Sequence, residues 1–141
     1  MTRETLEEYY SIASRIQAID EEIRILYTPK LGGSGNSIGA GRSSVMISGN
    51  PTEETALRVT ALKEKLEAER ERLLSLAEEI EAWLDTVTDP EIEAIVRWHY
   101  LLRCNWNITT LRVYGYKDYW YARKRLFRFF EKSENCPNCP N

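Results

Sequence analysis

Basic and aromatic side chains lie close together near the C-terminal end of the chain, between residues 116 and 130. Arginine and lysine neutralise phosphates, and aromatic rings make apolar contacts with bases. With Asp118 as its N-cap, this segment predicts a helix from Tyr119 to about Lys132 that binds DNA. The candidate DNA-binding residues are Lys117, Tyr119, Trp120, Tyr121, Arg123, Lys124, Arg125 and Arg128.

The three- and four-residue spacing of apolar side chains divides this predicted helix into two faces. The face expected in the core carries Tyr119, Ala122, Leu126 and Phe129. The opposite, exposed face carries Tyr121, Lys124, Arg125 and Arg128, with Trp120, Arg123 and Phe127 at its edges. Residues near the start of a recognition helix reach deepest into a groove, so the later cations are expected to contact mainly the phosphate backbone.

Other residues with reactive side chains form weaker patterns. Cys136 and Cys139 make one C-x-x-C pair, whereas a structural zinc needs four ligands. Because Cys104 and His99 are expected in the core, a zinc site would have to be shared by two chains. We favour the simpler interpretation that residues 133–141 form a flexible tail. No nucleophile, base and oxyanion site come together, so the sequence predicts neither an enzyme nor a cofactor.

Two shorter helices are expected to position the basic one. Asp89 can cap the first of them, and Asn105 can cap the second, over residues 106–114. Gly115 then suits a turn that needs a positive φ. Three helices with a tight turn before the last are the order of a helix-turn-helix, so residues 89–132 are predicted to form a DNA-binding module.

Residues 1–88 predict two long helices that fold back on each other. Each carries apolar residues at spacings of three and four, the pattern of a coiled-coil seam. The first seam is Tyr9, Ile12, Ile16, Ile19, Ile23 and Leu26. The second is Val59, Leu62, Leu66, Glu69, Leu73, Leu76, Ile80, Trp83 and Val87, with only Glu69 breaking the apolar pattern. Thr52 can cap the second helix.

The glycine- and serine-rich residues 28–50 predict a flexible loop between these helices and lack a phosphate-binding pattern. The expected fold is therefore all-α: a long antiparallel coiled-coil helical hairpin followed by a C-terminal three-helix helix-turn-helix module. Because the second helix is the longer one, part of its seam is left for the C-terminal module or for a second copy in a homodimer.

The net charge of −3 hides an uneven distribution. Residues 1–90 contain ten Lys/Arg and seventeen Asp/Glu, whereas residues 91–132 contain nine and four. The basic part is the one expected to meet phosphates, and the acidic part is expected to lie away from DNA or to meet a protein. No apolar run approaches the roughly 18 residues that span a bilayer, and the polar N-terminus is unlike a signal peptide, so we expect a cytoplasmic protein that does not enter the membrane.

Several short motifs of the chain also form a recognisable set. They are Trp83-Leu84-Asp85, Asp89-Pro90-Glu91-Ile92, Arg97, Tyr100, Trp106, Tyr114-Gly115-Tyr116, Arg123-Lys124-Arg125 and Phe129-Phe130. In these the chain resembles the RinA/ArpU-type late-gene regulators of phages and prophages, with a C-terminal module similar to region 4 of sigma-70 factors. The resemblance implies a sequence-specific DNA-binding protein of phage transcription. Sigma-like modules usually begin the recognition helix with small polar residues, where this chain has Tyr119, Trp120 and Tyr121.

Two other functions remain open at this level. The acidic hairpin and the aromatic last helix also suit an interaction protein that binds RNA polymerase or another protein. A small terminase-like subunit for DNA packaging would use the same elements in a ring oligomer. Double-stranded DNA is the partner that the basic segment predicts most directly.

Overall fold

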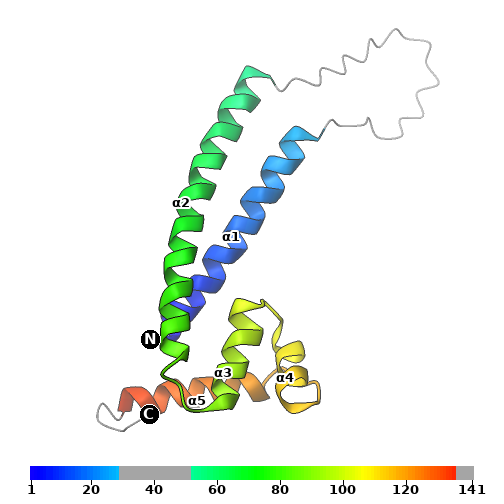
Figure 1. Cartoon of the computed structure of the whole chain (residues 1–141). Coiled ribbons are helices and arrows are strands. Elements are labelled where there is room, and N and C mark those ends of the chain that lie inside the picture. Colours follow the sequence, from blue (N-terminus) through cyan, green and yellow to red (C-terminus); the bar gives the residue numbers. More distant parts are fainter. Residues whose placement is uncertain (29–51, 136–141) are drawn as a thin grey trace, which may run out of the picture.

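The computed structural model describes residues 1–28 and 52–135, and all the regular structure in these ranges is helical (Figure 1). The expected all-α class is therefore confirmed for this part of the chain. The loop predicted at residues 28–50 lies, apart from Thr28, outside the described residues. Cys136 and Cys139, and with them the zinc hypothesis, also lie outside them.

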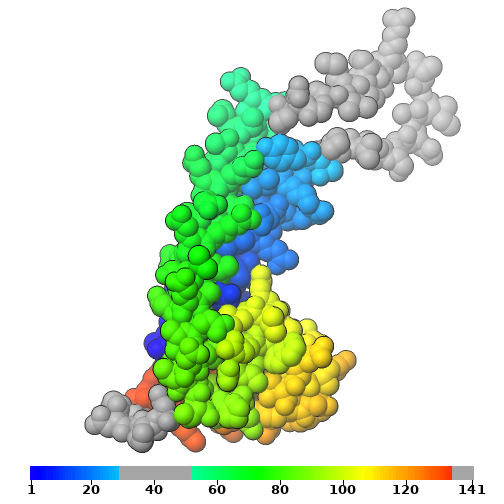
Figure 2. Space-filling view, in the orientation of Figure 1, coloured from blue at the N-terminus to red at the C-terminus, as the bar shows by residue number. Residues whose placement is uncertain are grey.

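Helices α1 (Arg3–Tyr27) and α2 (Glu53–Leu84) run side by side in opposite directions (Figures 1 and 2). Each begins at a threonine cap, because the side chains of Thr2 and Thr52 accept a hydrogen bond from the backbone N–H three residues later. Helix α1 starts six residues before the first residue of the predicted seam. This extra length carries Leu6, which is completely buried.

Apolar side chains and ion pairs together join the two long helices. Glu69, which interrupts the predicted seam, receives hydrogen bonds of 3.1 and 3.2 Å from the guanidinium of Arg15 on α1. A charged residue is thus accommodated at the contact by a bidentate partner on the other helix. The other ion pairs between α1 and α2 are Glu22 with Arg58, Asp20 with Arg70, and Glu8 with Arg72.

The C-terminal part contains α3 (Pro90–Val96), η1 (Arg97–Leu101), α4 (Trp106–Tyr114) and α5 (Tyr121–Asn135). The predicted caps of α3 and α4 are confirmed: Asp89 accepts from the N–H of Glu91 at 3.0 Å, and Asn105 accepts from the N–H of Ile108 at 2.9 Å. A turn of π-helix, η1, follows α3 and was not predicted from the sequence. It is followed by Arg103 with a left-handed φ of 57°.

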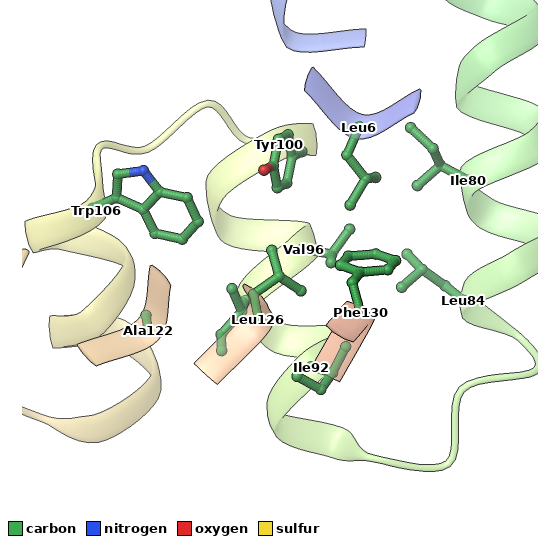
Figure 3. Packing of buried hydrophobic residues seen from close by; sticks show 11 residues of the cluster. Leu6, Ile80, Leu84, Ile92, Val96, Tyr100, Trp106, Ala122, Leu126 and Phe130 are labelled. Atoms are coloured by element: carbon green, nitrogen blue, oxygen red, sulfur yellow. The ribbon is translucent and has the colours of Figure 1, made fainter. Parts of the chain in front are cut away.

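One apolar core connects the open end of the hairpin to the C-terminal helices (Figure 3). Leu6 of α1 and Ile80 and Leu84 of α2 belong to the same buried cluster as the inward side chains of the C-terminal part. Those side chains are Ile92, Ile95, Val96, Tyr100, Trp106, Ala122, Leu126 and Phe130. Helix α2 is longer than α1. Its C-terminal end, which carries Ile80 and Leu84, therefore packs on the C-terminal helices.

The buried face of α5 differs from the expected one. The helix begins at Tyr121, two residues later than predicted, and extends to Asn135. Its buried residues are Ala122, Leu126 and Phe130, at a regular spacing of four. The prediction that Tyr119 belongs to the core is wrong, because this residue precedes the helix and is 42% exposed. Phe129, also expected in the core, is only partly buried and packs at its edge.

Candidate nucleic-acid interface

A tight turn at Gly115 separates α4 from α5. Gly115 has a φ of 84°, in the left-handed region, and its N–H donates to the carbonyl of Leu111 at 2.9 Å. A Cβ added at Gly115 would meet no atom within 4 Å. Glycine is therefore needed here for its backbone conformation and not for space, as the sequence predicted.

The carboxylate of Asp118 holds the start of α5. Its Oδ1 accepts hydrogen bonds from the N–H groups of Trp120, at 2.6 Å, and of Tyr121, at 2.9 Å. This satisfies backbone donors that the first turn of a helix leaves free. Tyr119 and Trp120 consequently lie in the bend that leads into the helix, and the Trp120 side chain is 55% exposed.

Two cations lie against the exposed rings at this end of α5. The guanidinium carbon of Arg123 is 5.4 Å from the ring centre of Trp120 and 5.0 Å from that of Phe127. The ammonium of Lys124 is 5.9 Å from the ring centre of Trp120. At these distances the ring faces attract the cations. We call the surface made by Tyr116, Tyr119, Trp120, Tyr121, Arg123 and Lys124 the aromatic–basic patch.

The eight candidate DNA-binding residues do not share one environment. Six of them are exposed around the bend and the first turns of α5: Lys117, Tyr119, Trp120, Tyr121, Lys124 and Arg128. Arg123 is partly buried among the aromatic rings, and its guanidinium also lies 5.8 Å from the centre of Tyr119. Arg125 differs from all of these because it is directed toward α3.

Arg125 bridges α5 to the first turn of α3. Its Nη2 lies 2.5 Å from Oδ2 of Asp89, and its Nε lies 3.2 Å from Oε2 of Glu91. The hydroxyl of Tyr114 donates to the same Glu91 oxygen at 3.1 Å, and burial together with this contact raises the pKa of Tyr114. Arg125 is therefore half-buried and paired with carboxylates, and not a member of the open face that the helical spacing predicted.

One exposed ring of the patch was missed as a candidate site residue. Tyr116, 46% exposed, follows Gly115, and its ring centre lies 5.8 Å from that of Tyr121. Tyr121 in turn meets Tyr114 edge-on at 4.7 Å. Its position in the sequence, between a turn glycine and a lysine, could have identified Tyr116 as exposed, because residues in such turns are seldom buried.

His99 is packed in the core, as expected. Its ring is stacked between Tyr10, at 5.3 Å, and Trp106, at 3.6 Å between ring centres. Nδ1 lies 2.8 Å from the carbonyl oxygen of Cys104, which can only accept, so Nδ1 carries the proton. Burial lowers the pKa of His99 to about 4.

Residues 1–28 and 52–135 contain neither a metal-binding cluster nor a membrane-spanning helix. No three His, Cys, Asp or Glu side chains gather there in a way that could hold a metal ion. Within the same residues, no helix combines the length and the apolar character needed to cross a bilayer.

Comparison of the chain with models of protein families, with curated proteins and with solved structures gave no match.

Proposed function

We propose that this chain is a DNA-binding transcriptional regulator that uses α4, the turn at Gly115 and α5 as a helix-turn-helix on double-stranded DNA. One observation carries the proposal: the cap at Asp118 gathers exposed cations and aromatic rings at the start of α5. In a helix-turn-helix the corresponding end of the second helix enters the major groove. The resemblance to phage late-gene regulators suggests the promoter DNA of phage late genes as the first DNA to test.

The distribution of charge supports this orientation. Lys117, Lys124 and Arg128 are exposed, and no ion pair involves them among the described residues. Their charges are therefore available to phosphates, whereas the charge of Arg125 is shared with two carboxylates. Most of the acidic residues lie on the long hairpin, and the C-terminal end of α1 and the N-terminal end of α2 extend away from α5 (Figure 1).

A salt titration of DNA binding tests the proposal. Fluorescence anisotropy with a labelled duplex would give the affinity at several salt concentrations, and selection from a random duplex pool would test sequence specificity. Replacing Lys117, Lys124 and Arg128 with alanine should weaken binding to every sequence. If all three contact phosphates, the slope of log K against log salt should become shallower by about 2.7, at roughly 0.9 per contact.

A matched control removes the same charge elsewhere. Arg58, Arg70 and Arg72 lie on α2 and pair with carboxylates of α1, so their replacement by alanine lowers the net charge equally without touching the patch. This variant should keep most of the affinity and the salt slope. Equal losses in both triple variants, or a wild-type affinity that does not depend on salt, would contradict a DNA interface at α5.

A protein partner is the second candidate function. The observation in its favour is that Tyr116, Tyr119, Trp120 and Tyr121 all expose large parts of their rings, and aromatic residues are enriched in protein interfaces. RNA polymerase is the partner to test first for a regulator. Binding of the purified polymerase in the absence of DNA, lost on Trp120→Ala and unaffected by the Lys/Arg variants, would favour this function.

A further inference from the structure

The first turn of α5 offers few hydrogen-bonding groups for reading base edges. Sequence reading in the major groove relies on side chains such as Arg, Asn and Gln that make two hydrogen bonds to one base. Tyr119 and Tyr121 offer one hydroxyl each, and Trp120 offers one indole N–H. Arg123, the nearest arginine, already lies against three aromatic rings. This end of α5 therefore exposes aromatic rings next to positively charged side chains.

Trp120 differs from Trp106 and Trp83 in having no stacked aromatic partner among the residues that the structure describes. Trp106 is stacked on His99 at 3.6 Å between ring centres, and Trp83 is stacked on Phe130 at 5.8 Å. Among the described residues, the one aromatic contact of Trp120 is edge-on with Tyr119, at 4.9 Å and 85°. Trp120 is 55% exposed. Beside the cations of Arg123 and Lys124, which lie over its ring at 5.4 and 5.9 Å from the centre, it retains aromatic surface on which another ring could stack.

The backbone and the charges around Trp120 suit a ligand that carries phosphate. The hydrogen bond from its N–H to Asp118 fixes the residue in the bend, so ordering it on binding costs little entropy. Arg123 and Lys124 lie within 6 Å of the ring centre, and the exposed Lys117 is close in sequence. Stacking on an aromatic ring beside cations is how proteins hold unpaired nucleotides.

We infer that Trp120 is a stacking site for an unpaired base, so that the chain prefers DNA in which bases are unpaired over a fully paired duplex. This inference rests on the proposed function, since it assumes that the aromatic–basic patch faces DNA. A paired base presents only its edge in the groove, whereas a base that has left its stack presents its whole face to the indole. Lys124 and Arg123 then lie beside the phosphates of the strand that carries this base.

The test compares three DNA ligands of equal length: a fully paired duplex, the same duplex with a short unpaired stretch at its centre, and one of its single strands. Each is titrated with the wild-type chain, Trp120→Ala and Trp120→Phe. Leu102→Ala is the control, because Leu102 is a 60% exposed apolar residue outside the patch. Circular dichroism checks that every variant is folded.

The wild-type chain and Leu102→Ala should bind DNA with unpaired bases at least about tenfold more tightly than the paired duplex, within the range measured for one stacked base. Trp120→Ala should abolish this preference, and Trp120→Phe should keep most of it. Tryptophan fluorescence should be quenched by the single strand in the wild-type chain and much less in Trp120→Phe. These results would support the inference.

Two kinds of result would overturn it, and they can be told apart. Equal affinity of the wild-type chain for paired and unpaired DNA, or a preference that survives in Trp120→Ala, would remove the stacking site while leaving DNA binding intact. Absence of binding to all three ligands would remove the proposed function and the inference with it. If Trp120→Ala proved unfolded, the comparison of wild type with Trp120→Phe by fluorescence quenching would still decide the matter.

Discussion

The guanidinium of Arg125 lies 2.5 Å from the carboxylate of Asp89, so the residue that caps α3 also binds the middle of α5. A helix that presents side chains to a ligand must be held at a defined angle to the rest of the fold. This contact does so across 36 residues of sequence, and Glu91 supports it. The arginine is therefore expected to act on the stability of the module more than on the ligand.

Replacing Arg125 with alanine should lower the free energy of unfolding by about 1 kcal/mol, the upper end of the range for surface ion pairs, because both partners are half-buried. Urea denaturation would measure this change. Arg128→Ala, an exposed neighbour on the same helix, should change stability by less than about 0.5 kcal/mol. For the affinity for DNA we expect the opposite order, with the larger loss in Arg128→Ala. A larger affinity loss in Arg125→Ala would contradict the assigned roles.

Gly115→Ala should destabilise the chain by about 1 kcal/mol, because alanine is strained in the left-handed conformation that this position adopts. A steric clash is not the cause, since the space around the new Cβ is open. Gly115→Asn should cost less, because asparagine tolerates this conformation better. Thermal unfolding of both variants would measure the difference, and equal stability of Gly115→Ala and the wild type would show that the turn relaxes to another geometry.

Stability should fall when the pH is lowered from about 6.5 toward 4, because of His99. The pKa of His99 is about 4 in the folded chain and about 6.5 in an unfolded one, so the unfolded state binds more protons in this window. The loss should be on the order of 2 kcal/mol, less than the full shift implies, because the folded ring is itself half protonated at pH 4.

His99→Phe keeps a ring between Tyr10 and Trp106 but cannot be protonated. Its free energy of unfolding should therefore vary much less between pH 6.5 and 5.5, a window in which most carboxylates stay ionised. Urea denaturation at several pH values would give both profiles. An equally steep pH dependence in His99→Phe would assign the effect to other groups.

The ion pair between Arg15 and Glu69 predicts a non-additive pair of substitutions. Arg15→Ala should lower the unfolding temperature, because it leaves the Glu69 carboxylate, whose side chain is only 17% exposed, without its partner at the helix contact. The hydrogen bonds from Arg15 hold the pKa of Glu69 below its ordinary value, and this pKa should rise in the variant.

Adding Glu69→Leu to the Arg15→Ala variant should restore the stability that Arg15→Ala removes, because leucine completes the apolar seam of α2. Thermal unfolding of the wild type, the two single variants and the double variant would measure the coupling. A double variant that is less stable than Arg15→Ala alone would show that the seam is not closely packed around residue 69.

The sequence by itself determined the helices and several of their ends. Thr52, Asp89 and Asn105 were predicted as caps, and Gly115 as a left-handed turn, from residues next to them in the chain. These predictions succeeded because a cap or a turn depends on a side chain and backbone groups two to four residues away. The all-α class followed from the spacing of apolar residues in the same way.

Only the tertiary structure decided which side chains meet across the fold. The burial of Leu6 depends on α2 and η1, and the choice of Phe130 over Phe129 depends on where α5 begins and on what lies beneath it. The pairing of Arg125 with Asp89 joins residues that are close only after α3 and α5 have packed together. Helical periodicity gives the direction of a side chain on its own helix but carries no information about the partner opposite, and that is why the roles of these residues could not be predicted from the sequence.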